Sequence, residues 1–154
     1  MKRFAIAALL LSALATLTSP CLGFCIPPFG WHSKSLVERM ELGEAEVVVL
    51  ATVDATSPAH PYKYPYTADL IVDCVYKDTS GESERLPDYL KDVEGFGGSW
   101  DCAETRVEAG TQYIIFLNRR GPYAAEVAEV NSQSGAEQAI PTRLKKVEEK
   151  YQCI

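Results

Sequence analysis

The apolar and polar residues of this 154-residue chain follow two different patterns. Residues 45–53 read AEVVVLATV, an almost wholly apolar and β-branched run that is typical of a strand buried on both faces. Residues 66–76 alternate instead, which predicts a strand with one buried face. That face consists of Tyr66, Ala68, Leu70, Val72, Cys74 and Tyr76. The opposite face carries Thr67, Asp69, Asp73 and Lys77, so Cys74 is expected to face the core.

Two segments carry the signals of helices. Ser35 with Glu38 three residues later forms a capping-box pattern, and Gly43 marks the end of this short helix. Near the C-terminus an apolar stripe at helical spacing predicts a second helix, with Pro141 in its first turn. The stripe consists of Ile140, Leu144, Val147 and Tyr151. We expect this helix to dock on the rest of the domain through that stripe.

The segments between these elements are rich in turn-forming residues. Residues 57–66, SPAHPYKYPY, are rich in proline, which removes amide donors from a strand ladder, so a loop is expected. Residues 78–92 are polar, and the glycines of the GFGG sequence that follows indicate a bulge or a sharply bent strand. After Gly110, the run TQYIIFL predicts a central strand, with residues 123–130 as its hairpin partner.

Five or so antiparallel strands, with one helix before them and one after, predict a mostly β fold. In a disulfide-bonded secreted chain, this order fits a small OB-type antiparallel β-barrel with a short N-terminal helix and a C-terminal helix. Periodicity alone leaves a β-sandwich equally open.

Composition and charge narrow the function classes. Apolar residues make up 47% of the chain and charged residues 23%, as in globular proteins, and the length suits a single domain. Fifteen Lys and Arg oppose twenty-one Asp and Glu, which gives a net charge of −6, and the basic residues form no cluster. Nucleic-acid binding is therefore not expected.

The first residues carry the pattern of a secretory signal peptide. Two basic residues precede an apolar run at residues 4–15 that is too short to span a bilayer. Cleavage is expected before Phe24, with the Ala-Leu-Ala sequence at 13–15 as a second site, so residues 1–23 form the signal peptide and residues 24–154 one domain. No later apolar stretch suits a transmembrane segment, and we expect the protein to be secreted and extracellular.

Cleavage before Phe24 leaves an even number of cysteines, which predicts two disulfides in an oxidising compartment. The four are Cys25, Cys74, Cys102 and Cys153. Zinc binding is disfavoured because the four lie far apart in the sequence and because His32 and His60 are isolated from them. No metal or other cofactor is expected. Four cysteines allow three pairings, and the cysteine spacing does not choose among them.

Residues suited to catalysis are scarce. His32 precedes a helix cap and His60 lies in the proline-rich loop, so structural or surface roles explain both better than base catalysis does. Asp69 and Asp73 share one strand face, which could suggest paired carboxylates but is typical of a solvated sheet face. No nucleophile elbow, phosphate-binding loop or dinucleotide fingerprint is present in the sequence, and we expect no enzyme.

The proline-rich loop is the candidate partner-binding surface. Prolines stiffen it, and tyrosines supply contact area at low entropic cost. The candidate residues are His60, Tyr62, Tyr64 and Tyr66. Tyrosines that pack the loop onto the barrel explain the same residues equally well. A structural matrix protein that holds calcium through acidic residues is a weaker hypothesis, because these residues occur singly or in pairs.

The order of these features resembles the netrin-like (NTR) module of tissue inhibitors of metalloproteinases, netrins and complement C-terminal domains. The shared features are an early Cys25, the strand AEVVVLATV, the strand YTADLIVDCVYK, Cys102 ahead of EAGTQYIIFL, and a terminal helix closing with KYQC. The chain is also similar to the N-terminal domain of favine, which has a Trp shortly after its first Cys, as Trp31 follows Cys25 here. The resemblance implies an OB-type barrel with flanking helices and a Cys25–Cys102 disulfide, which leaves Cys74 to pair with Cys153.

The resemblance also implies two functions. In the inhibitors the mature N-terminal Cys binds the protease zinc through its amine and carbonyl, which makes Cys25 and Ile26 the candidate inhibitory residues. Under the expected cleavage Phe24 precedes Cys25 and displaces that amine, and zinc ligation tolerates only small distance errors. We therefore predict a non-enzymatic module that binds an extracellular protein or matrix component. Metalloproteinase inhibition is the alternative, and a structural matrix role is a further one.

Overall fold

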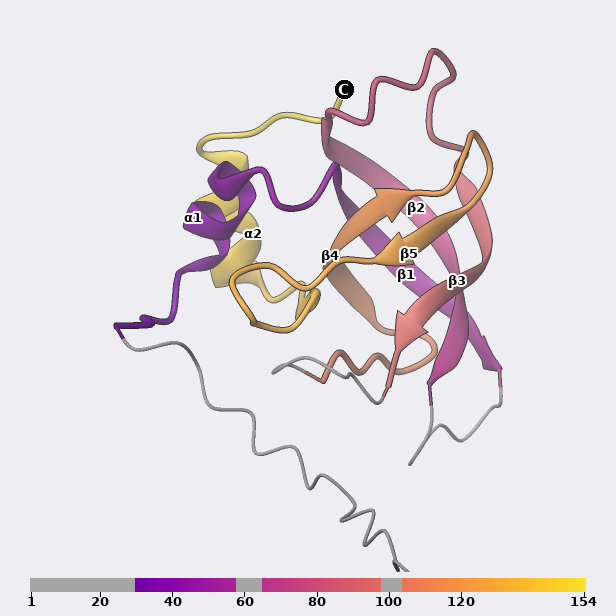
Figure 1. Ribbon diagram of the computed structural model, residues 1–154, viewed down its shortest axis with the longest axis horizontal. Helices are drawn as coiled ribbons and strands as arrows, with labels where there is room; N and C mark the ends of the chain where they lie inside the picture. The colour runs from indigo at the N-terminus through magenta and orange to yellow at the C-terminus, as the bar shows by residue number, and fades with distance from the viewer. Residues whose placement is uncertain (1–29, 58–64, 98–103) are drawn as a thin grey trace, which may run out of the picture.

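The computed structural model describes residues 30–57, 65–97 and 104–154 and places six strands and two helices in them (Figure 1). The strands are β1 Val47–Ser57, β2 Tyr66–Asp78, β3 Tyr89–Phe96, β4 Gln112–Arg119, β5 Ala125–Val127 and β6 Ala136–Gln138. The helices are α1 Leu36–Leu42 and α2 Pro141–Glu148. All but one of the elements longer than three residues were predicted from the sequence, the exception being β3.

Five of these strands close into a barrel. The pairing runs β1-β2-β3-β5-β4, and β4 pairs back with β1, which closes the ring. All these pairs are antiparallel except β3 with β5, which is parallel and joins Glu94 to Glu126. The predicted mostly β, OB-type barrel is confirmed, and the sandwich alternative is wrong because the sheet closes on itself.

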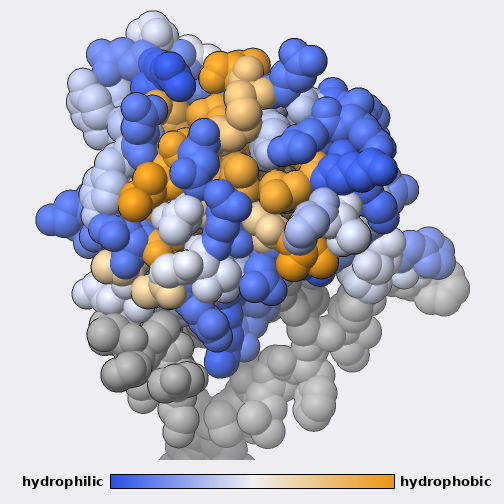
Figure 2. Space-filling view, turned by 180° about the vertical axis from the view of Figure 1, so that it is seen from behind, coloured by the Kyte–Doolittle hydropathy of each residue, from blue (hydrophilic) through white to orange (hydrophobic). Residues whose placement is uncertain are grey.

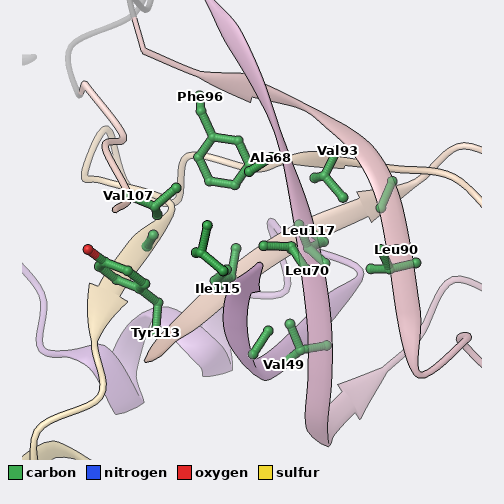
Figure 3. Close-up of a cluster of buried hydrophobic side chains, with 14 of the residues drawn as sticks. Val49, Ala68, Leu70, Leu90, Val93, Phe96, Val107, Tyr113, Ile115 and Leu117 are labelled. Atoms are coloured by element: carbon green, nitrogen blue, oxygen red, sulfur yellow. The ribbon is translucent and has the colours of Figure 1, made fainter. Parts of the chain in front are cut away.

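Apolar side chains from all five strands fill the barrel (Figure 3). Those labelled in the figure are Val49, Ala68, Leu70, Leu90, Val93, Phe96, Val107, Tyr113, Ile115 and Leu117. They point toward one another from opposite walls, and the interior is a packed core. Such a core stabilises the fold by about 25 cal/mol for each Å² of apolar surface removed from water.

A second apolar layer lies outside the barrel, beneath the two helices. It contains Met40, Ala45, Val48, Cys74, Tyr76, Ile114, Phe116, Ala128, Val130 and Val147. Val48 belongs to this layer and its neighbours Val47 and Val49 to the barrel interior, so β1 is buried on both faces as its run of valines predicts.

The position of Cys74 corrects the expected alternation of β2. Leu70 points into the barrel, but Cys74 is buried in the layer beneath the helices. Leu50 and Ala51 are consecutive residues of β1, but they pair with Cys74 and Val72 of β2. Asp73 is therefore an extra residue in β2. Such a bulge shifts the register, and a shift by one residue moves the following side chains to the other face.

The strand β3 begins inside the segment expected to be a polar turn. Its buried residues Leu90, Val93 and Phe96 are spaced by three, so they show no strand periodicity. The register against β2 shifts twice along β3, where Asp92 and Gly95 adopt left-handed φ angles of 52° and 94°. Each shift inserts one extra residue into β3, so the side chains that point into the barrel are three residues apart instead of two. The bulge predicted from the glycines is therefore present.

Both predicted helices are confirmed. The Ser35 hydroxyl accepts from the Glu38 amide at 3.4 Å, the Glu38 carboxylate accepts from the Ser35 amide at 2.7 Å, and Gly43 ends α1 with φ 74°. Pro141 starts α2, and Val147 is its fully buried residue. The two helices lie side by side against one side of the barrel (Figure 1).

A disulfide joins Cys74 of β2 to Cys153, which lies beyond the end of α2. It ties the C-terminal segment to the barrel, as the resemblance implied. The other two cysteines, Cys25 and Cys102, lie outside the described residues.

Candidate functional site

The outer surface of β1 passes from a covered part to an open part. Val48 lies beneath the helices and is fully buried, Leu50 packs partly against the same layer, and Thr52 is half-buried. On the neighbouring β4, Phe116 and Ile114 are covered in the same way. The helices therefore shield one end of these strands and leave the other end uncovered.

Four side chains on the uncovered part form a row across four strands. Gln112 of β4 pairs with Thr52 of β1, Thr52 with Ile71 of β2, and Ile71 with Tyr89 of β3. The side chains of Ile71 and Tyr89 are 41% and 46% exposed, although both sit within regular strands. We call this row, with the neighbouring Asp54, Asp69 and Asp73, the open face.

The carboxylate of Asp73 orients one end of the row. Its Oδ2 atom accepts hydrogen bonds from the Thr52 hydroxyl and from the Gln112 amide, both at 2.9 Å. Three strands are thereby linked through one oxygen atom, and all three side chains are held in defined positions.

Two further carboxylates orient Tyr89. Its hydroxyl lies 2.9 Å from Asp54 Oδ2 and 3.2 Å from Asp69 Oδ2, so one phenol proton faces two acceptors. Asp69 is itself held by the Asp92 amide, which donates to Oδ1 at 2.8 Å. The hydrogen bond to Asp54, followed by partial desolvation, raises the pKa of Tyr89 to about 12. The phenol therefore stays protonated and its ring is fixed in place.

The three carboxylates of the open face form no ion pair with any Lys, Arg or His of the described residues. None of the seven ion pairs of residues 30–57, 65–97 and 104–154 contains Asp54, Asp69 or Asp73. Lys91 is exposed two residues beyond Tyr89 but makes no ion pair with them. Nor are three His, Cys, Asp or Glu side chains grouped to hold a metal ion anywhere in these ranges.

The predicted partner-binding residues are only partly described. Tyr66 is 4% exposed and stacks on Phe96 inside the barrel, where its hydroxyl donates to the Val107 carbonyl and accepts from the Val107 amide. Burial raises the pKa of this phenol. Tyr66 thus contributes to the core and offers little surface to a partner. His60, Tyr62 and Tyr64 lie outside the described residues, as do the candidate inhibitory residues Cys25 and Ile26.

The remaining candidate groups take structural positions. His32 is exposed, and its backbone carbonyl accepts from the Asn131 side chain at 3.1 Å. Asp69 and Asp73 hold different partners on the sheet and do not converge on a common point.

One sequence signal could have located the open face. The polar side of β2 contains Thr67, Asp69 and Asp73, and Ile71 interrupts that polar series. An apolar residue on the solvated face of an alternating strand indicates either a bulge or an exposed contact. Tyr89 carried no such signal, because the segment around it was expected to be a turn.

Comparison with protein-family models and with curated proteins found no match for this chain. Within the described ranges, no helix has the length and apolar character needed to cross a bilayer.

Proposed function

We propose that this protein is a secreted, non-enzymatic netrin-like module that binds an extracellular protein or matrix component through the open face. The observation that carries this proposal is the cross-strand pair of Ile71 and Tyr89: both side chains are exposed on the sheet, and two carboxylates hold the Tyr89 hydroxyl.

The open face has the anatomy of a protein-binding surface. Interfaces combine an apolar or aromatic centre with a polar rim, and tyrosine is enriched among the residues that contribute most binding energy. Ile71 and Tyr89 form such a centre, and carboxylates surround them. Because the strands and hydrogen bonds already hold these side chains, binding would cost little conformational entropy.

Two observations support the extracellular part of the proposal. A disulfide between Cys74 and Cys153 persists in oxidising compartments, and the first residues carry the pattern of a signal peptide. The order of the sequence features supports the netrin-like part of the proposal. A closed barrel with one helix before its strands and one after them in the chain is consistent with that order.

Site-specific photo-cross-linking tests the proposal. A benzoylphenylalanine at position 71 of the tagged, secreted protein is expected to cross-link to a defined extracellular protein. The matched control carries the same group in place of Tyr123, which is 70% exposed on the turn before β5. Identical products from both positions, or none from position 71, would overturn the proposal.

A second assay distinguishes the proposed function from metalloproteinase inhibition. Purified metalloproteinases are assayed with the unmodified protein and with the Ile71→Asp variant. Inhibition that is equal for both would instead favour a mechanism through the Cys25 region.

A further inference from the structure

We infer that the open face binds a cationic segment in which two Arg or Lys residues flank an apolar residue at alternate positions, Arg-x-Leu-x-Arg being the simplest form. This inference rests on the proposed function of that face and specifies the chemistry of its partner.

The carboxylates of the open face are oriented by neutral donors and keep their negative charge. Asp54 and Asp73 engage only their Oδ2 atoms in the described structure, so each keeps one acceptor oxygen available. Asp69 accepts through both oxygens. The donors to all three carboxylates are a phenol, a hydroxyl and amides, all of which are neutral. The donors orient the carboxylates without cancelling their charge, which remains available to a cation from outside.

The carboxylates of the molecule differ in how they are held. In the described ranges, the carboxylates beside buried arginines are paired, as Asp78 is with Arg119 at 3.2 Å and Glu137 with Arg39 at 2.6 Å, whereas others, such as Glu148 and Glu149, are exposed at the end of a helix. On the open face, three carboxylates surround an apolar centre, and none of them has an ion pair with a cation of the residues that the structure describes. The negative charge there favours association with a positively charged surface and disfavours an acidic one.

The spacing of the side chains along β2 matches the period of an extended segment. Asp69, Ile71 and Asp73 follow one another at every second residue of β2, and Ile71 is paired with Tyr89. Alternate residues of a strand are about 6.6 Å apart, because each residue rises about 3.3 Å. An extended segment with the same period can place its cations at the two carboxylates and its apolar side chain on Ile71. An arginine near Tyr89 gains a further contact with the face of the ring.

The test uses a synthetic probe. A nine-residue peptide, acetylated and amidated at its ends, carries Arg-Thr-Leu-Thr-Arg at its centre, and matched peptides replace both arginines with glutamine or with glutamate. Binding is followed by amide chemical shifts of the full secreted protein. We expect shifts centred on Ile71 and Tyr89, at least about tenfold weaker binding of the glutamine peptide, and none of the glutamate peptide.

Charge variants of the protein complete the test. The double variant Asp69→Asn with Asp73→Asn should bind the arginine peptide about tenfold more weakly, since an exposed ion pair contributes a factor of about two to five. The matched control, Glu148→Gln with Glu149→Gln, removes the same charge from exposed positions at the end of α2 and should bind as the wild type does. Thermal unfolding of each variant verifies its fold.

The outcomes distinguish this inference from the proposed function. If position 71 still cross-links a natural partner while the arginine and glutamine peptides bind equally, the cationic chemistry is wrong and the binding face stands. If neither binds, both are wrong. If calcium ions alone produce the same shifts around Ile71 and Tyr89, the face binds a metal ion and the inference is overturned.

Discussion

The covered and open parts of the outer sheet surface belong to the same strands but hold their polar groups differently. Beneath the helices, Arg39 is 2% exposed and lies over the ring of Phe116 with its guanidinium carbon 5.2 Å from the centroid. It donates to the Ser134 carbonyl at 2.7 Å and pairs with Glu137 at 2.6 Å. On the open face, carboxylates hold neutral donors and large side chains remain exposed.

This difference separates stability from binding. A buried cation must be paired and hydrogen-bonded, because an unpaired charge in the interior is costly. An exposed carboxylate is solvated and needs no cation within the protein, so it can pair with a cation of another molecule. We therefore expect substitutions in the covered part to change the free energy of unfolding and substitutions in the open part to change binding.

The largest expected effect concerns the disulfide. Replacing Cys74 and Cys153 together with alanine opens a loop with a sequence separation of 79 residues. A loop of that length predicts a loss of roughly 4 kcal/mol in the free energy of unfolding, measured by chemical denaturation. Hydrogen exchange should show a larger loss of protection in α2 than in β1 and β2, because the strands lose only the global stability whereas α2 can also open by itself. Equal loss of protection in all three elements would contradict the division into two parts.

The next effect concerns the buried cation. Arg39→Ala removes the pair with Glu137 and leaves the Ser134 carbonyl unsatisfied, and we expect it to cost about 3 kcal/mol. The control is Lys150→Ala, which removes an exposed pair with Glu41 and should cost less than about 1 kcal/mol. Similar unfolding midpoints for the two variants would show that burial of Arg39 contributes little.

A smaller effect tests how α2 docks. Val147 is fully buried, and Val147→Ala should cost about 2 kcal/mol through lost burial and the cavity that remains. Lys145→Ala, on an exposed position of the same helix, should stay within about 0.5 kcal/mol of the wild type. Leu144 is only half-buried, so the stripe predicted from the sequence is anchored chiefly at Val147. If Val147→Ala unfolds at the wild-type midpoint, α2 is not held by this contact.

The smallest effect belongs to the open face and depends on pH. The folded-state pKa of Tyr89 is raised to about 12, above the usual value of 10, so its hydrogen bonds stabilise the fold fully below pH 10. This contribution is lost as the pH rises through about 12. The stability difference between the wild type and Tyr89→Phe should therefore be larger at pH 8 than at pH 11, as measured by urea denaturation. An unchanged difference would mean that the phenol proton is not held by Asp54 and Asp69.

Much of the fold could be predicted because the relevant interactions are local. The capping box of Ser35 and Glu38 and the proline at position 141 act within a few residues, and both helices form where these signals stand. The run of valines in β1 and the alternation of β2 from Tyr66 to Val72 likewise identify strands from side-chain pattern alone.

The tertiary structure decided what depends on distant pairing. The bulge at Asp73 moves Cys74 out of the barrel interior, and two bulges in β3 give Leu90, Val93 and Phe96 a spacing that no strand pattern predicts. The glycines of GFGG marked one of these bulges in the sequence, but which side chains a bulge redirects depends on the match between two strands, so neither strand encodes that by itself. The open face depends on the same pairing, because Thr52, Ile71 and Tyr89 come from three strands and become neighbours only when β1, β2 and β3 pair, and Gln112 joins them only when β4 closes the barrel. Sequence pattern thus determined which segments are helices and most of the strands, and tertiary pairing decided which of their side chains are covered and which remain open to a partner.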